Sequence, residues 1–156
     1  LLKRACPVKP VRHASTWARM AESKIDPRIQ SRIEKLKEGA KAHLAKCEYA
    51  EALSCLDLAI DLNTSSFKLY RLRAITHTCL GNFEGSAADA DKVIELAPSI
   101  TDGYYHKGYS LFNLKRFSEA AHAFQEGMLI NPNDQVLKQG FWDSIALVSQ
   151  SRSEKK

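Results

Sequence analysis

The sequence predicts an all-α fold in which paired helices stack into an α-α superhelix. Its main signature is a 34-residue period, which separates Tyr49 from Phe83 and Phe83 from Phe117. Four other columns repeat at the same step, namely Ala40, Ala74 and Gly108; Ala52, Ser86 and Ala120; Leu62, Leu96 and Ile130; and Thr64, Pro98 and Pro132. Between these columns, apolar residues recur every three or four positions, the spacing of one helix face. Such a period is typical of solenoids, in which each unit buries its apolar face only against its neighbours.

The first predicted helix begins at Asp26-Pro27. An Asp side chain can accept the first free amide hydrogens of a helix, and Pro is tolerated at the first helical position. Apolar positions then follow one stripe that ends near Cys47: Ile29, Ile33, Leu36, Ala40 and Leu44. A second stripe runs from Tyr49 to Leu62 before the turn-forming residues 63–66. The two segments predict an antiparallel pair, with the first repeat at about 31–66.

The same pair of helical segments recurs twice more, at about 67–100 and 101–134, with predicted turns at Gly81-Asn82 and at Asn131-Pro132. Residues 134–149 form one further amphipathic segment that starts at Asp134. We expect this segment to be a C-terminal capping helix that covers the apolar end of the third repeat. The predicted domain therefore comprises residues 26–149, and residues 150–156 are expected to be a frayed tail.

Residues 1–25 are predicted to be a basic, largely flexible leader with a short helix at 15–23. In that helix Trp17 and Met20 would share one side, and they would either enter the groove of the repeats or cover the first repeat. Residues 1–30 hold seven basic and two acidic side chains, whereas the other 126 residues hold 16 of each. Nucleic-acid binding is therefore not expected of the repeats, although the leader leaves open a structural or RNA-associated role.

Composition indicates an ordinary globular chain, with 44% apolar and 26% charged residues. No apolar run approaches the roughly 20 residues of a membrane span. The chain begins with Leu, so we expect a fragment, a processed product or part of a larger complex. The four cysteines form no CxxC pair, which favours reduced thiols and a cytoplasmic or nuclear location.

No arrangement of residues predicts catalysis, a cofactor or a metal site. His43 and Cys47 lie four residues apart, but no second ligand pair accompanies them, and a zinc site requires three or four ligands. Several carboxylates lie on second helices, where a solvated surface is expected: Asp57, Asp61, Asp89, Asp91 and Glu95. The chain is therefore predicted not to be an enzyme.

These columns resemble the tetratricopeptide repeat (TPR), a 34-residue helix-turn-helix unit of protein-interaction scaffolds. The resemblance covers Ser31 to Asp134 and the capping helix. The chain departs from the usual pattern at Cys47 in place of a glycine, at Thr64 in place of the last proline, and at Arg73 in place of an apolar residue. The resemblance implies a non-catalytic adaptor or scaffold that binds a peptide or a partner subunit.

Three repeats plus a cap are also similar to co-chaperone domains that clamp the acidic C-terminal tail of heat-shock chaperones. The resemblance places the five clamp positions at Lys37, Lys41, Leu72, Asp102 and His106. Only Lys37 has the expected residue type, because the other positions would be Asn, Asn, Lys and Arg. Chaperone-tail binding is therefore the alternative function.

First helices of such repeats line the concave face, so residues 34 apart lie side by side across it. Three rows result: Lys37, Arg71 and Tyr105; Lys41, Ile75 and Tyr109; and Leu44, Thr78 and Phe112. The groove is thus predicted to be basic at one end and aromatic at the other. This pattern favours a protein or peptide partner that has an acidic part and an apolar anchor.

Overall fold

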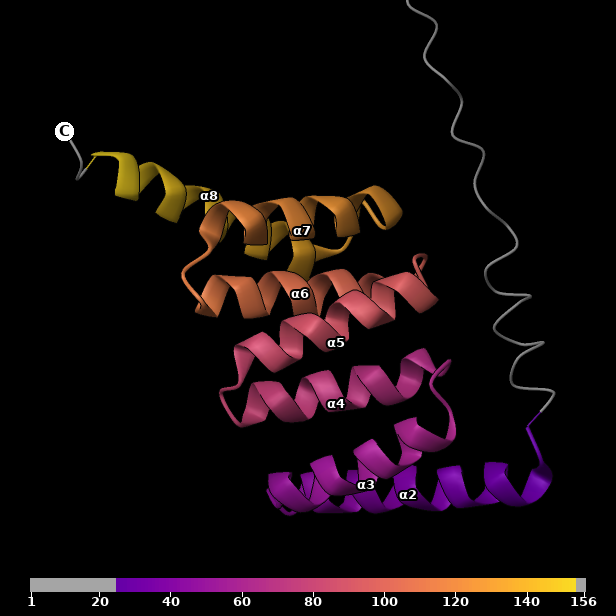
Figure 1. Cartoon of the computed structure of the whole chain (residues 1–156). Helices are drawn as coiled ribbons and strands as arrows, with labels where there is room; N and C mark the ends of the chain where they lie inside the picture. Colours follow the sequence, from indigo (N-terminus) through magenta and orange to yellow (C-terminus); the bar gives the residue numbers. More distant parts are fainter. Residues whose placement is uncertain (1–24, 154–156) are drawn as a thin grey trace, which may run out of the picture.

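The computed structural model describes residues 25–153, which form seven α-helices and no strand. The helices are α2 (Pro27–Ala45), α3 (Tyr49–Leu62), α4 (Phe67–Cys79), α5 (Phe83–Leu96), α6 (Thr101–Asn113), α7 (Phe117–Ile130) and α8 (Gln135–Ser153). Figure 1 shows them stacked in chain order from α2 to α8. The predicted all-α superhelix is therefore confirmed. Trp17 and Met20 lie outside the described residues.

Carboxylate caps begin the first and the last of these helices, as the sequence predicts. The Oδ1 atom of Asp26 accepts a hydrogen bond of 2.7 Å from the amide of Arg28, and Pro27 is the first helical residue. Asp134 accepts in the same way from the amides of Val136 and Leu137, at 3.0 and 3.2 Å. Helix α8 continues to Ser153, past the expected end at residue 149. There, the hydroxyl of Ser153 donates to the carbonyl oxygen of Gln150, one of the last four carbonyls, which lack an amide partner within the helix.

Each first helix of a pair ends in the same backbone turn. Cys47, Gly81 and Lys115, which are 34 residues apart, have φ values of 61°, 72° and 63°. The next amide in each case, that of Glu48, Asn82 or Arg116, donates a 2.9 Å hydrogen bond back to the helix. This is the Schellman geometry, which closes a helix through one left-handed residue. The turn therefore repeats even where the glycine does not.

Small residues lie where the helices approach most closely. Ala40, Ala74, Ala52 and Ala120 are completely buried. At Gly108 an added Cβ would lie 2.7 Å from the ring of Phe124, so α6 and α7 could not pack as they do with a larger residue there. The small-residue columns of the sequence are thus the helix-crossing positions.

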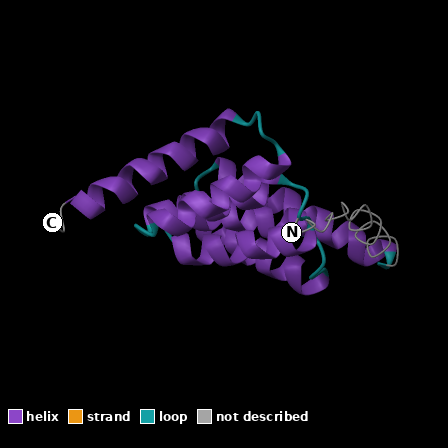
Figure 2. Cartoon of the chain, turned by 90° about the horizontal axis from the view of Figure 1, so that it is seen from above, coloured by secondary structure: helices purple, strands orange, loops and turns teal. Residues whose placement is uncertain are grey.

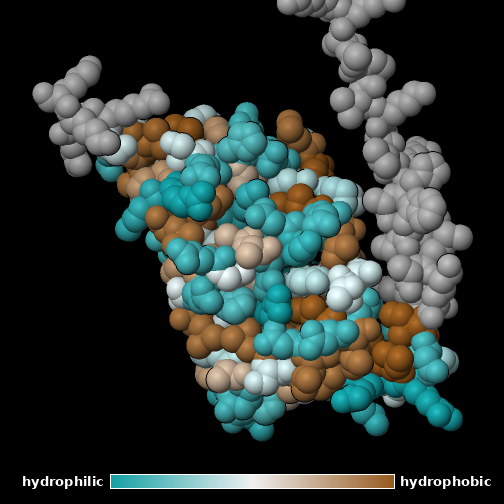
Figure 3. Space-filling model, viewed as in Figure 1, coloured by the Kyte–Doolittle hydropathy of each residue, from teal (hydrophilic) through white to brown (hydrophobic). Residues whose placement is uncertain are grey.

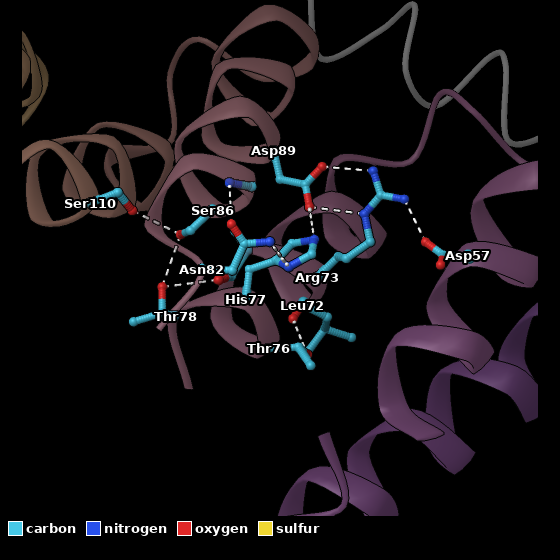
Figure 4. Close-up of polar contacts among 12 residues, drawn as sticks. Asp57, Leu72, Arg73, Thr76, His77, Thr78, Asn82, Ser86, Asp89 and Ser110 are labelled. Carbon is cyan, nitrogen blue, oxygen red and sulfur yellow. Dashed lines mark hydrogen bonds and ion pairs between the residues drawn. The ribbon is translucent and has the colours of Figure 1, made fainter. Parts of the chain in front are cut away.

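The core consists of two apolar clusters separated by a polar seam. The first cluster lies among α2 to α5 and includes Leu56, Leu69 and Val93, and the second lies among α6 to α8 and includes Phe124 and Leu137. Three hydroxyl groups form the centre of the seam between α4, α5 and α6: Ser86 Oγ is 2.9 Å from both Thr78 Oγ1 and Ser110 Oγ. Figure 4 shows these side chains pointing toward one another.

One buried ion network corrects the expectation that the second-helix carboxylates are all solvated. Asp89 is only 4% exposed, because Arg73 from α4 covers it with two hydrogen bonds of 2.9 and 2.7 Å. The same guanidinium donates at 2.6 Å to Asp57 on α3 (Figure 4). Burial is tolerated because a two-pronged donor satisfies both oxygens. Arg73 therefore connects three helices.

Alternate helices form an inner layer that positions the candidate site. Helix α4 contacts α6 directly and α6 contacts α8, whereas each pair of neighbours in sequence also packs together. Figure 2 shows the far end of α8 extending beyond the other helices. In Figure 3, hydrophilic and hydrophobic side chains are interspersed over the face seen in Figure 1. None of the described helices has the length and hydropathy that a membrane crossing requires.

Candidate functional site

The first pocket of the inner layer is basic. It lies between α2 and α4, has a volume of about 300 Å³, and is lined by Lys37, Lys41, Phe67, Lys68, Arg71, Leu72 and Ile100. Four of these residues are cationic, and the other three give the pocket an apolar surface. Such a combination suits a ligand that carries negative charge next to aliphatic groups.

Three of the four cations in this basic pocket have a carboxylate partner. Lys37 pairs with Glu34 at 2.6 Å, Lys41 pairs with Glu38 at 2.7 Å, and Arg71 pairs with Asp102 at 2.7 Å. Within the described part of the chain, Lys68 has no carboxylate within ion-pair distance. Exposed ion pairs of this kind contribute only about 0.2–1 kcal/mol. A ligand anion can therefore displace the carboxylate from its lysine or arginine, or share that cation with it, at little cost in free energy.

The second pocket is aromatic and lies between α6 and α8. Its volume is about 210 Å³, and its lining residues are Tyr105, Tyr109, Phe112, Phe124, Val136, Gln139, Gly140 and Asp143. The rings of Tyr105 and Tyr109 are stacked with centroids 6.0 Å apart. Helix α8 comes close to this wall because residue 140 is a glycine, where a Cβ would lie 2.6 Å from Phe124. The pocket can therefore hold a side chain with a long apolar surface.

The structure brings six of the nine predicted groove residues to these two pockets. Lys37, Lys41 and Arg71 line the basic pocket, and Tyr105, Tyr109 and Phe112 line the aromatic pocket. Leu44 and Ile75 line neither of them, and the hydroxyl of Thr78 donates to the carbonyl of Ala74 instead. The binding role of all nine remains a prediction.

Sequence reasoning missed the residues that complete the pockets. In the basic pocket these are Phe67, Lys68 and Ile100, and in the aromatic pocket they are Phe124, Val136, Gln139, Gly140 and Asp143. Lys68 lies one helical turn before Arg71, so the helical period could have indicated it. Gln139 and Asp143 of α8 lie 34 residues after Tyr105 and Tyr109, so the repeat period could have indicated them as well.

His106 lies partly buried on α6 beside the ion pair of Arg71 and Asp102. Burial lowers the pKa of His106 below its ordinary value of 6.5, and the positive charge of Arg71 acts in the same direction. The carboxylate of Asp102 opposes this effect, but burial dominates. The imidazole at this position is therefore neutral at pH 7 and adds no positive charge to the groove.

Comparisons with known proteins agree with this geometry. Residues 101–134 match the sequence profile of the tetratricopeptide repeat family. The chain is 33% identical over 124 residues to the small glutamine-rich tetratricopeptide repeat-containing protein 2 of Mycosarcoma maydis, which covers 79% of this chain and 35% of that protein. The TPR domain of Sgt2 from Aspergillus fumigatus superposes with a TM-score of 0.74 at 20% identity, over 84% of this chain and 85% of that one. The described residues form a tetratricopeptide repeat domain.

A second solved TPR domain, the first of Spaghetti (RPAP3) bound to the HSP90 peptide SRMEEVD, has a TM-score of 0.73 at 21% identity. The match covers 76% of this chain and 94% of that one. At such identities the likeness to solved structures concerns the TPR fold. The matched part of the chain covers only 35% of the length of the Mycosarcoma maydis relative.

Within this TPR domain, the five clamp positions carry an altered set of contacts. Lys37 lines the basic pocket, and Leu72 contributes an apolar wall where the clamp would have an amide. Asp102 reverses the charge of its clamp position and neutralises Arg71 at 2.7 Å. Among the described residues, Lys68 is consequently the one cation lining the basic pocket that has no carboxylate partner.

Proposed function

We propose that this TPR domain is a non-catalytic adaptor that binds a peptide segment of another protein in its concave groove. The observation that carries the proposal is the pairing of a basic pocket of about 300 Å³ with an aromatic pocket of about 210 Å³ on the inner helix layer. Acidic residues of the partner would bind at Lys37, Lys41 and Lys68. An apolar group of the same segment would occupy the aromatic pocket.

A peptide-display selection against the purified chain tests this function. Enriched sequences are expected to combine Asp or Glu with an anchor residue, and a selected peptide should bind about 10-fold more weakly to a Lys37→Ala, Lys68→Ala variant. Lys35→Ala is the matched control, since Lys35 is an exposed lysine of α2 that lines neither pocket. A consensus without acidic residues, or equal losses in the variant and the control, would refute groove recognition.

Binding of chaperone tails is the second candidate, because a similar fold was solved with an HSP90 peptide and Lys37 retains one clamp position. On this reading, a peptide ending in Glu-Glu-Val-Asp binds in the low micromolar range and loses that affinity in Lys37→Ala. The adaptor proposal expects weak binding instead, since Asp102 and Leu72 cannot hold a terminal carboxylate.

A gain-of-function variant separates the two candidates further. Leu72→Asn, Asp102→Lys and His106→Arg together restore three of the four missing clamp groups and leave Lys41 as it is. We expect this triple variant to bind the Glu-Glu-Val-Asp peptide at least about 10-fold more tightly than the natural chain, because one positive charge is added, one negative charge is reversed and one amide is supplied. Equal, tight binding by both chains would favour the co-chaperone function.

A location in the cytoplasm or nucleus belongs to the same proposal and is supported by the reduced thiols. The described cysteines Cys47, Cys55 and Cys79 are all free. Disulfides are rare in those compartments. Expression of the tagged protein in cells, followed by microscopy, would test the location.

A further inference from the structure

The aromatic pocket has polar groups at one edge, which a purely apolar side chain could not contact through hydrogen bonds or charge. Asp143 of α8 lines this pocket together with the four rings of Tyr105, Tyr109, Phe112 and Phe124. Asp143 is exposed, and it makes no ion pair with any side chain that the structure describes. Its one hydrogen bond is donated by the neutral amide of Gln139, at 2.8 Å.

The polar groups at this edge are acceptors that lack a charged donor. Gln139 donates through Nε2 to Asp143, which leaves the amide oxygen of Gln139 to accept. No lysine, arginine or histidine lines the pocket. A carboxylate and an amide oxygen beside aromatic rings match the chemistry of a cation, which rings attract through their negative faces.

We propose that the aromatic pocket binds a basic side chain, lysine or arginine, of the partner segment. The aliphatic stem lies against Tyr105, Tyr109 and Phe124, and the ammonium or guanidinium group reaches Asp143. This inference rests on the proposed function, because it specifies which residue of the bound segment enters the aromatic pocket.

Charge across the groove supports this choice of occupant. The lysines of the basic pocket repel a basic residue, whereas the carboxylate of Asp143 attracts one. A segment with acidic residues at one point and a lysine or arginine at another would thus bind in one direction only. The reversed orientation would place like charges together at both pockets.

Capped amino acids test the aromatic pocket on its own. N-acetyl-lysine methylamide and its neutral counterpart N-acetyl-norleucine methylamide have the same stem, so their difference measures the ammonium group. Each is titrated into the 15N-labelled chain at low salt while the amides of Tyr105 and Gly140 are followed. We expect the lysine probe to bind at least about fivefold more tightly than the norleucine probe. N-acetyl-arginine methylamide should behave as the lysine probe does.

Asp143→Asn provides the decisive variant, because it keeps the hydrogen bond from Gln139 and removes only the charge. The lysine-to-norleucine affinity ratio should fall to about one or two in this variant. It should stay unchanged in Asp61→Asn, which removes an exposed carboxylate of α3 outside both pockets. A norleucine probe that binds as tightly as lysine, a ratio insensitive to Asp143→Asn, or no binding of any probe would overturn the proposal.

A separate measurement identifies failure of the underlying function. A capped tetraglutamate peptide is titrated into the same sample, and the amides of Lys37 and Arg71 are followed. If tetraglutamate shifts the amide resonances of Lys37 and Arg71 but the Gly140 amide does not distinguish the lysine probe from the norleucine probe, the basic anchor is refuted. The groove proposal would then still hold. If the Gly140 amide shows tighter binding of the lysine probe but tetraglutamate has no effect, recognition of acidic residues by the basic pocket is refuted instead.

Discussion

Three turns at equal steps hold a left-handed residue, and only one of these residues is a glycine. Cys47 and Lys115 adopt φ values of 61° and 63° with side chains that disfavour this region. For a residue with a Cβ the conformation costs roughly 1–2 kcal/mol. Replacement by glycine removes that cost but gives the unfolded chain about 0.5–1 kcal/mol of additional conformational freedom.

We therefore expect Lys115→Gly to raise the free energy of unfolding by about 0.5–1 kcal/mol, as measured by urea denaturation. Lys115→Ala retains the strain and serves as the control, with little change expected. Gly81→Ala should lose about 1 kcal/mol, since an added Cβ meets no atom there and only the backbone is strained. If glycine at 115 proves less stable than alanine, the strain argument is wrong.

His106 makes a pH-dependent contribution to stability. Because burial lowers the pKa of His106 in the folded chain, the unfolded chain binds a proton first as the pH falls. The contribution of His106 is therefore complete above its ordinary pKa of 6.5 and is lost as the pH falls toward the lower, folded value.

The free energy of unfolding should consequently decrease more between about pH 7.5 and pH 5.5 in the natural chain than in His106→Gln. Urea denaturation of both chains at the two pH values measures the difference. Every other ionisable group is common to both chains, so its contribution cancels in the comparison. An identical decrease in the two chains would mean that His106 titrates normally.

At the level of helices, Arg73 connects α4 to α3 and α5 through charge. A residue that is usually apolar at this repeat position is replaced here by a guanidinium that makes three hydrogen bonds to Asp57 and Asp89. Both carboxylates together raise the pKa of Arg73, chiefly through the hydrogen bonds to Asp89, so its charge is permanent. The buried partner, Asp89, depends on this charge because little water reaches it.

Arg73→Met should destabilise the chain by about 3–5 kcal/mol, since it removes both hydrogen bonds to the buried carboxylate of Asp89 and leaves only His77 Nε2, 3.8 Å away, as a charged partner. The double variant Arg73→Met, Asp89→Ala should recover most of this loss, because it removes the stranded charge as well. Thermal and urea unfolding of both variants measure the coupling. Arg116→Met, which breaks the exposed pair of Arg116 with Glu119, is the control and should change little. If Arg73→Met lowers the free energy of unfolding as little as Arg116→Met does, the buried ion network does not stabilise the fold in this way.

The fold of the whole molecule was predictable because one period sets helix length, turn position and packing together. The small residues Ala40, Ala52 and Ala120 indicate the helix crossings from the sequence alone, and all three are fully buried. Asp89 was predicted wrongly to be solvated, because a carboxylate on a helix gives no sign that an arginine 16 residues earlier in the chain covers it. Such pairings depend on how neighbouring repeats are rotated.

The candidate site was predictable only in part, for a related reason. The rows of residues 34 apart indicated Lys37, Arg71 and Tyr105, because equivalent positions of stacked units face the same side. Asp143 was missed although it lies 34 residues after Tyr109, because the predicted rows end with the third repeat. Gly140 was missed because its role depends on a close contact with Phe124 that no sequence column indicates. The capping helix thus contributes to the site as well as to the end of the solenoid.

Because the core consists of two clusters, we expect the stability of the two ends of the molecule to depend on α8 to different degrees. Leu137 of α8 is 1% exposed and belongs to the second cluster with Leu111 and Phe124, whereas Leu56 and Val93 belong to the first cluster. In a solenoid, each unit is stabilised mainly by its neighbours. Loss of α8 should therefore weaken α6 and α7 much more than α2 to α5.

Ending the chain at Asp134 should lower the protection of α6 and α7 amides by about 3–5 kcal/mol in native-state hydrogen exchange, the cost of exposing a buried leucine and phenylalanine. Amides of α2 to α5 should retain most of their protection, because the hydroxyl seam at Ser86 and Ser110 separates the clusters. Trp142→Ala in the full-length chain is the control; this side chain is 62% exposed and should matter little. Equal loss of protection in all six remaining helices would instead mean that the clusters unfold as one cooperative unit, with the polar seam transmitting stability as well as an apolar core does.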